Sequence, residues 1–174
     1  MTSTATSLLE KAHAFAIAKH RGQNGKRPGE PYISHVEAVV QLLADHGHDR
    51  PGLLAGAYLH DCLEKTATTI GELITEFGEE VAELVYWLTD PEDSKGDEKE
   101  LLSAWLLGRA PIDAKLIKLA DIIDNAEAIR VHDSARWPSF SKGKAIVLER
   151  MARIEGRNFA QLPLYMAARR VVRA

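Results

Sequence analysis

The chain has 174 residues, of which 45% are hydrophobic and 27% charged, a balance typical of one ordinary soluble domain. Its 22 basic and 25 acidic residues give a net charge of -3, which argues against a general nucleic-acid binder. The single cysteine, Cys62, excludes an internal disulfide, and no apolar run approaches the roughly 20 residues that a membrane span needs. The N-terminus lacks the pattern of a secretory signal, so we expect a cytoplasmic protein.

Helical spacing of apolar residues dominates the first half of the chain, and no alternating period of two is sustained. We expect the first helix to begin at Ser7, which opens a capping-box pattern, and to end near Gly22. The next segment, 23–31 (QNGKRPGEP), holds two glycines and two prolines and is therefore predicted to be a loop. A second capping-box pattern, at Ser34, predicts the start of the second helix.

Three further helices are expected before a charged segment. Pro51 suits the first turn of a third helix, which is apolar almost all round and therefore central. Thr69 is the predicted N-cap of a fourth helix, and Gly78 separates that helix from a fifth. The segment 89–99 (TDPEDSKGDEK) is expected to be an exposed loop.

Helical patterns return in the second half of the chain, at about 100–107, 111–131, 142–157 and 162–173. No internal repeat or linker divides the sequence. We therefore predict an all-α bundle of about eight to ten helices that forms a single domain over residues 1–174.

Three His-Asp dipeptides occur in the chain, so the dipeptide alone carries little meaning. The pairs at 48–49 and 132–133 lie in a turn and at a helix end, where both residue types are ordinary. The pair His60-Asp61 instead falls inside AGAYLHDCLE, in the predicted central helix. Because an isolated buried charge is costly, this pair requires a metal ion or a tight ion pair.

A second carboxylate is predicted to be buried, since Asp121 is flanked by apolar residues in a long helix, with Asn125 on the same face. His35, after the GEPYISH turn, supplies another imidazole. Two imidazoles and two carboxylates suit a divalent ion such as Mn²⁺, Fe²⁺ or Zn²⁺ and indicate a hydrolytic metal site. Taken singly, Asp121 could be the ion-pair partner of Lys118 or Arg130, and His35 an ordinary residue of a helix start.

The order of these motifs resembles that of the HD-type metal phosphohydrolases, in which a histidine, a His-Asp pair and a distal aspartate follow one another. Within that group, four segments resemble the hydrolase domain of RelA/SpoT enzymes: HRGQ (20–23), GEPYISH (29–35), FGEEVAELV (77–85) and IKLAD (117–121). The resemblance runs from about Leu8 to Arg130, and a chain with this domain alone is similar to the small alarmone hydrolases. It implies an HD-domain fold and removal of the 3′-pyrophosphate from ppGpp or pppGpp.

The resemblance also implies roles for individual residues. The family's metal ligands match His35, His60, Asp61 and Asp121, and the ion is usually Mn²⁺. Asn125 matches a position that lies against the nucleotide. Guanosine polyphosphate is accordingly the expected partner, with neither nucleic acid nor membrane.

The chain departs from the family pattern HDxxED at its last position, because it reads HDCLEK. Glu64 therefore handles the attacking water and its proton alone, or the substrate differs. Lys65, with Lys26 and Arg27 of the preceding loop, is expected to neutralise the diphosphate, although the two loop residues could also be solvated charges. The alternatives are an HD phosphohydrolase for another nucleotide or a cofactor such as NADPH, and a nucleotide-binding protein with weakened turnover.

Overall fold

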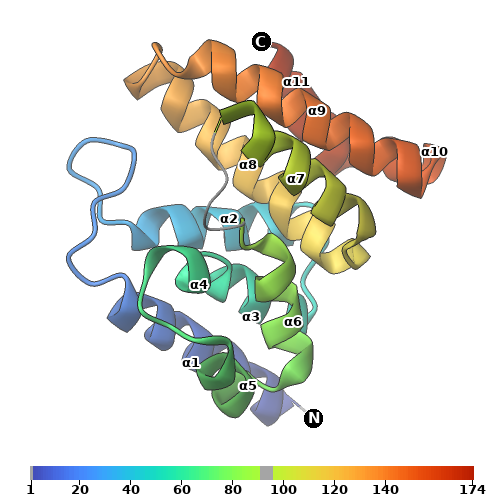
Figure 1. Ribbon diagram of the computed structural model, residues 1–174. Helices are drawn as coiled ribbons and strands as arrows, with labels where there is room; N and C mark the ends of the chain where they lie inside the picture. The colour runs from blue at the N-terminus through green and yellow to red at the C-terminus, as the bar shows by residue number, and fades with distance from the viewer. Residues whose placement is uncertain (1, 91–95) are drawn as a thin grey trace. The chain divides into compact units, whose positions relative to one another are not determined.

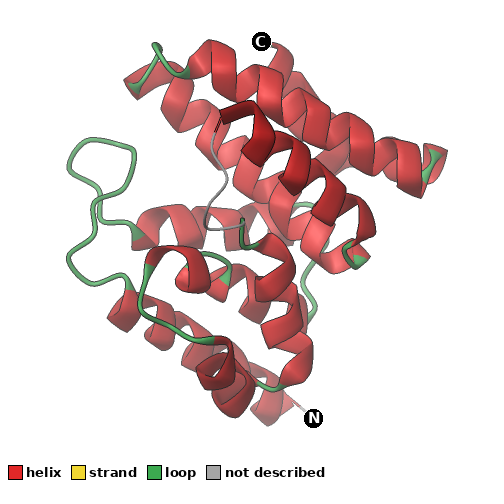
Figure 2. Cartoon of the chain, viewed as in Figure 1, coloured by secondary structure: helices red, strands yellow, loops and turns green. Residues whose placement is uncertain are grey.

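The computed structural model describes residues 2–90 and 96–174, and in these ranges the chain consists of helices and loops (Figure 2). Extended pairing there is limited to one isolated bridge between Asn24 and Pro31. The all-α prediction is confirmed. Eleven helices are present in the described residues, slightly more than expected, because two of them have only four residues. None of the described helices is long and apolar enough to cross a membrane.

The chain divides into two compact units, Met1–Thr89 and Asp90–Ala174 (Figure 1). The N-terminal unit contains α1 (Thr2–Lys19), α2 (Ile33–Asp45), α3 (Pro51–Leu59), α4 (Cys62–Lys65), α5 (Ile70–Phe77) and α6 (Glu79–Leu88). The C-terminal unit contains α7 (Gly96–Arg109), α8 (Ile112–His132), α9 (Trp137–Glu155), α10 (Arg157–Ala160) and α11 (Pro163–Arg173). A single domain over the whole chain remains a prediction.

The core of the N-terminal unit forms around α3, which packs against α1, α2 and α6. This confirms the prediction of a central third helix. The buried cluster that joins α3 to α1, α5 and α6 contains Ala12, Ala55, Leu59, Cys62, Leu73, Phe77, Val81, Ala82 and Val85. Since each large apolar side chain contributes about 1.5–3 kcal/mol on burial, this cluster fixes the end of α3, where the His-Asp pair follows.

Of the three hydroxyl side chains predicted to cap helix starts, two are placed wrongly. Ser7 lies inside α1, which begins at Thr2, and a hydroxyl caps a helix only where its own backbone leaves the helical conformation. Ser34 lies inside α2, whose N-cap is Tyr32; the backbone carbonyls of Pro31 and Tyr32 accept from the N–H groups of residues 34 and 35, so no side-chain cap is needed. Thr69 does cap α5, because its hydroxyl accepts from the backbone N–H of the third residue that follows.

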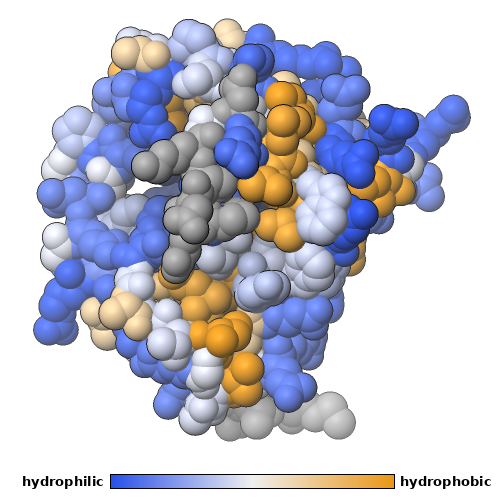
Figure 3. Space-filling model, in the orientation of Figure 1, coloured by the Kyte–Doolittle hydropathy of each residue, from blue (hydrophilic) through white to orange (hydrophobic). Residues whose placement is uncertain are grey.

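In the C-terminal unit, α9 packs against α7, α8 and α11, and α8 packs against α11. The predicted loop 89–99 is partly wrong, because α7 already begins at Gly96, while residues 91–95 lie outside the described residues. Helix α9 begins five residues earlier than expected, with Pro138 in its first turn, a position that favours proline. On the surface shown in Figure 3, hydrophobic side chains gather over α7, where Leu101 is 59% exposed.

Candidate active site

The His-Asp pair lies at a break between two helices and not inside one continuous helix, as the sequence predicted. Helix α3 ends at Leu59, His60 is its C-cap, and Asp61 is the N-cap of the four-residue helix α4. At this point the Nε2 atom of His60 lies 3.2 Å from the Oδ2 atom of Asp61.

His35 adds a second imidazole at the same point. Its Nε2 atom, carried by the first turn of α2, lies 3.6 Å from the Oδ2 atom of Asp61, and the two imidazole rings are 5.3 Å apart. His35, His60 and Asp61 are 5%, 3% and 5% exposed, so the three donor groups meet in a buried place. The N-terminal unit therefore brings together three of the four predicted metal ligands.

The tautomer of His60 follows from its other ring nitrogen. A backbone carbonyl only accepts hydrogen bonds, so the contact of 2.8 Å between Nδ1 of His60 and the oxygen of Ala57 requires a proton on Nδ1. In the neutral ring, the lone pair then sits on Nε2, the atom that faces Asp61. A lone pair and a carboxylate oxygen repel each other unless a cation stands between them. That cation is a second proton or a divalent metal ion, and the donor set suits the metal.

Two further side chains hold Asp61 in place. The hydroxyl of Tyr32 donates to Oδ2, and the ammonium of Lys65 lies 2.7 Å from Oδ1. Burial by itself raises the pKa of Asp61, but when Nε2 of His60 carries the second proton, the charges of His60 and Lys65 hold that pKa well below its usual range. The carboxylate is consequently ionised at neutral pH.

The structure also shows supporting residues to which the sequence gave no role. Gln23 accepts from the ring of His20 at 2.9 Å and donates to the backbone oxygen of Lys65 at 2.7 Å. The rings of His20 and Tyr32 lie 4.8 Å apart, and burial lowers the pKa of His20. These residues belong to the HRGQ and GEPYISH motifs, and these motifs are the sequence feature by which the supporting residues could have been identified. They tie the loop after α1 to the helix break that carries the His-Asp pair.

The remaining predicted residues of the N-terminal unit are less buried than the His-Asp cluster. Glu64 is exposed on α4, and Lys26 and Arg27 are half-buried in the loop between α1 and α2. This loop projects from the unit (Figure 1) and is closed by the N–H group of Gly25, which donates to the oxygen of Glu30 at 2.8 Å. The predicted loop is confirmed, whereas the roles of its two basic residues stay predictions.

Asp121 and Asn125 lie on α8 of the C-terminal unit, where both are buried. The amide of Asn125 donates to Oδ1 of Asp121 at 2.5 Å, which confirms that the two residues share a face. Lys118 donates to Oδ2 at 3.0 Å, so the ion pair that the sequence left open is also present. Asp121 is thus a buried carboxylate held by two neighbours, one turn before and one turn after it.

These features define a class of protein: an all-helical protein whose His-Asp cluster is compatible with a divalent metal ion. The chain belongs to the HD domain family, whose model matches residues 12–153. This confirms the resemblance that the sequence motifs showed.

Among its relatives is the human guanosine-3′,5′-bis(diphosphate) 3′-pyrophosphohydrolase MESH1, which is 39% identical over 127 residues, covering 72% of this chain and 70% of the human protein. The zebrafish (Danio rerio) protein of the same name is 36% identical over 127 residues, or 72% of this chain and 71% of its own. A solved structure of a metazoan ortholog of SpoT, described as hydrolysing ppGpp, superposes with a TM-score of 0.84 at 26% identity, covering 95% of this chain and 94% of that chain.

Proposed function

We propose that this protein hydrolyses the 3′-pyrophosphate of guanosine alarmones, converting ppGpp to GDP and pppGpp to GTP, with release of pyrophosphate. The observation that carries the proposal is the convergence of His35, His60 and Asp61 in a chain that is 36–39% identical to enzymes named for this reaction. A substrate of this kind needs a group that polarises a phosphoryl oxygen and activates water, and the cluster is suited to hold such a group.

We further propose that His35, His60, Asp61 and Asp121 hold one divalent ion, most simply Mn²⁺. When bound, the ion supplies Lewis acidity toward the phosphoryl oxygen and lowers the pKa of water. The tautomer of His60 and the ionised state of Asp61 support this ligand set in the N-terminal unit. For Asp121, the support is its burial as a carboxylate and its place in the order of motifs.

The proton of the attacking water is assigned to Glu64, the carboxylate left in HDCLEK where the family has two acids. Lys65 cannot accept a proton while it is charged, and its ammonium is paired with Asp61 at 2.7 Å. We therefore assign Lys65 to orienting Asp61 and neutralising nearby charge. Its location beside a metal ligand supports this role.

For the substrate, Lys26 and Arg27 are proposed to contact the diphosphate. The loop that carries them is tied to the His-Asp break through Gln23, which supports this assignment. Asn125 is proposed to lie against the nucleotide, next to the metal, because its amide is already bonded to Asp121.

The function is tested by incubating metal-loaded protein with ppGpp, pppGpp, the adenosine analogue, NADPH and GTP, and by identifying the products. We expect GDP and GTP from the two guanosine alarmones, each with one equivalent of pyrophosphate. Preferential turnover of NADPH or another nucleotide would replace the alarmone proposal with the broader HD phosphohydrolase. One observation favours a second candidate, a binding protein with weakened turnover: Lys65 stands where the family has an acid. Tight ppGpp binding without products would establish that candidate.

The ligand set is tested separately by the metal content of two matched variants after dialysis. Asp121→Asn should lose the ion, because an amide is a much weaker ligand than a carboxylate. Asp124→Asn is the control, since Asp124 is a buried aspartate of the same helix that the proposal does not use. Equal metal content in both variants would remove Asp121 from the ligand set. Circular dichroism should show helical proteins in both cases.

A further inference from the structure

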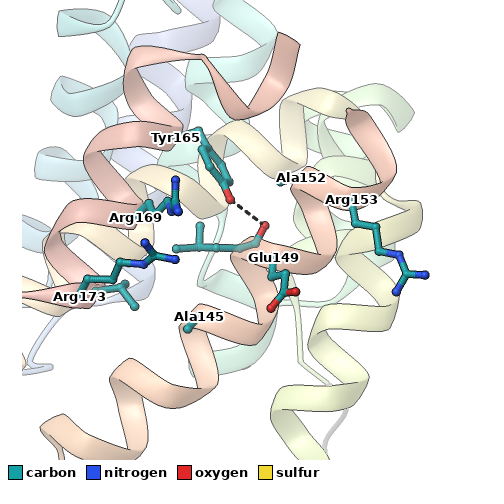
Figure 4. A pocket seen from close by; sticks show the side chains of 9 residues that line it. Ala145, Glu149, Ala152, Arg153, Tyr165, Arg169 and Arg173 are labelled. Carbon is teal, nitrogen blue, oxygen red and sulfur yellow. Dashed lines mark hydrogen bonds between the residues drawn. The ribbon is translucent and has the colours of Figure 1, made fainter. Parts of the chain in front are cut away.

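A groove runs along the C-terminal unit between α9 and α11, and no residue of the candidate active site lines it (Figure 4). Its volume of about 500 Å³ lies within the range typical of small-molecule sites, about 300–1,000 Å³. Small and apolar side chains contribute much of the lining: Ala145, Leu148, Ala152 and Val172. Such a surface suits a flat, weakly polar group.

The charged side chains of the groove are three arginines and one glutamate, which give it a formal charge of +2 in a chain whose net charge is -3. Arg169 and Arg173 lie one turn apart on α11, and Figure 4 shows them side by side, with Arg153 of α9 on the opposite side. Among the described residues, neither Arg169 nor Arg173 forms a salt bridge or a side-chain hydrogen bond. Two guanidinium groups thus stand uncompensated beside an apolar surface.

Helix ends alone do not explain this arrangement. Basic residues near a helix C-terminus interact favourably with the helix dipole, which accounts for Arg170 and Arg173 in the last turn of α11. The dipole does not account for the hollow beside them. That hollow exists because Ala145 and Ala152, two turns apart on α9, present methyl groups where larger side chains would fill the space.

Tyr165 gives the groove a rigid wall. It is buried, and its hydroxyl donates to the backbone oxygen of Leu148 at 3.3 Å, which ties α11 to α9 (Figure 4). The position of this part of the lining is therefore fixed by packing and by a hydrogen bond.

We propose that this groove is a second ligand site, which binds a nucleotide with its base on the apolar surface and its phosphates against Arg169 and Arg173. A guanidinium group can donate two parallel hydrogen bonds to a pair of phosphate oxygens. Two such groups on adjacent turns, neither of them in a salt bridge, suit a polyphosphate better than a single anion. The nucleoside explains the apolar surface, which a bare polyphosphate would leave unused. The site is independent of the proposed hydrolysis, because it shares no residue with it.

The experiment is a titration of the isotope-labelled full chain with GTP, followed by amide chemical shifts. We expect saturable shifts within 145–153 and 165–173, with an affinity that falls as salt rises. The double variant Arg169→Ala/Arg173→Ala should weaken this binding at least tenfold, because each arginine makes a charge-assisted contact to phosphate. Arg170→Ala, which removes the same charge from α11 outside the groove, should change the affinity less than twofold.

Further measurements test whether the nucleoside contributes to binding and whether removing a negative charge from the groove raises the affinity. Glu149→Gln should tighten GTP binding severalfold, since it removes the one negative charge of the groove. Tripolyphosphate should bind more weakly than GTP, and Ala152→Leu should block GTP by filling the hollow. The proposal is overturned if millimolar GTP shifts no amide in the two segments, if the arginine variants behave alike, or if tripolyphosphate binds as well as GTP. None of these outcomes depends on ppGpp hydrolysis.

Discussion

Replacing Tyr32 with phenylalanine removes one hydroxyl and keeps the ring, so it measures how strongly the buried Asp61 carboxylate depends on that hydrogen bond. Tyr32 is 7% exposed and the side chain of Asp61 is also 7% exposed, so water cannot replace the lost donor. A hydrogen bond to a charged group contributes about 1.5–3 kcal/mol. Because Lys65 and the two histidines still contact Asp61, we expect a loss near the lower end, about 1.5–2 kcal/mol.

Urea denaturation of the metal-free protein is the assay. With an m value of about 2 kcal/mol/M, the expected loss lowers the midpoint of unfolding by about 0.8–1 M. The matched control is Tyr58→Phe, because Tyr58 also lies in the N-terminal unit and its hydroxyl makes no hydrogen bond among the described residues. The control should change stability by less than about 0.5 kcal/mol.

The same two variants show whether the hydroxyl of Tyr32 positions Asp61 for metal binding or only stabilises the fold. Loss of a hydrogen bond to a metal ligand typically weakens metal binding by about 10- to 100-fold, so Tyr32→Phe should reduce Mn²⁺ affinity and Tyr58→Phe should not. If the two variants had equal midpoints and equal metal affinities, the hydroxyl of Tyr32 would have no role at Asp61, and the reasoning about this site would be refuted.

Three other outcomes are expected. Thr69→Ala removes the hydroxyl that accepts from Glu72 and should lower the free energy of unfolding by about 1 kcal/mol in urea denaturation, whereas Thr69→Ser should retain it. Burial raises the pKa of Cys62 to about 12, so the folded protein should resist iodoacetamide at pH 8 and react once unfolded; fast alkylation of the folded chain would contradict the buried position. Lys65→Asp replaces the ammonium beside Asp61 with a second carboxylate, so the metal-free protein should become less stable in urea. The added negative charge should also raise the affinity for Mn²⁺, measured by chelator competition. Changes in the opposite directions would remove Lys65 from the site.

The helical fold was predictable because buried apolar residues recur at helical spacing in nearly every element. The break at His60-Asp61 was not, since AGAYLHDCLE contains no proline and its single glycine lies well before the break. At this point Asp61 contacts His35 and Tyr32, which come from an earlier part of the chain, and Lys65, one turn later. Capping patterns at serine were misleading for a related reason, because the backbone of the preceding loop decides where α2 starts.

The proposed ligands were identifiable because ionisable residues in apolar surroundings need compensation, which applied to His60, Asp61 and Asp121 alike. The supporting residues could not be found in this way. Tyr32 reaches a partner 29 residues away, and Gln23 reaches one 42 residues away, so their roles emerge only when the chain has folded. The arginine groove was equally hidden, because its lining residues from α9 and α11 are unremarkable on each helix alone.

The most direct test of the proposed activity uses ppGpp in which the terminal phosphate of the 3′-diphosphate carries a ³²P label, and identifies the product that contains the label. Hydrolysis at the 3′ oxygen by a metal-supported site predicts labelled pyrophosphate with Mn²⁺, no product with a chelator, and at least about 100-fold slower release in His60→Ala. Labelled orthophosphate as the first product, or undiminished release of label by His60→Ala, would contradict the account.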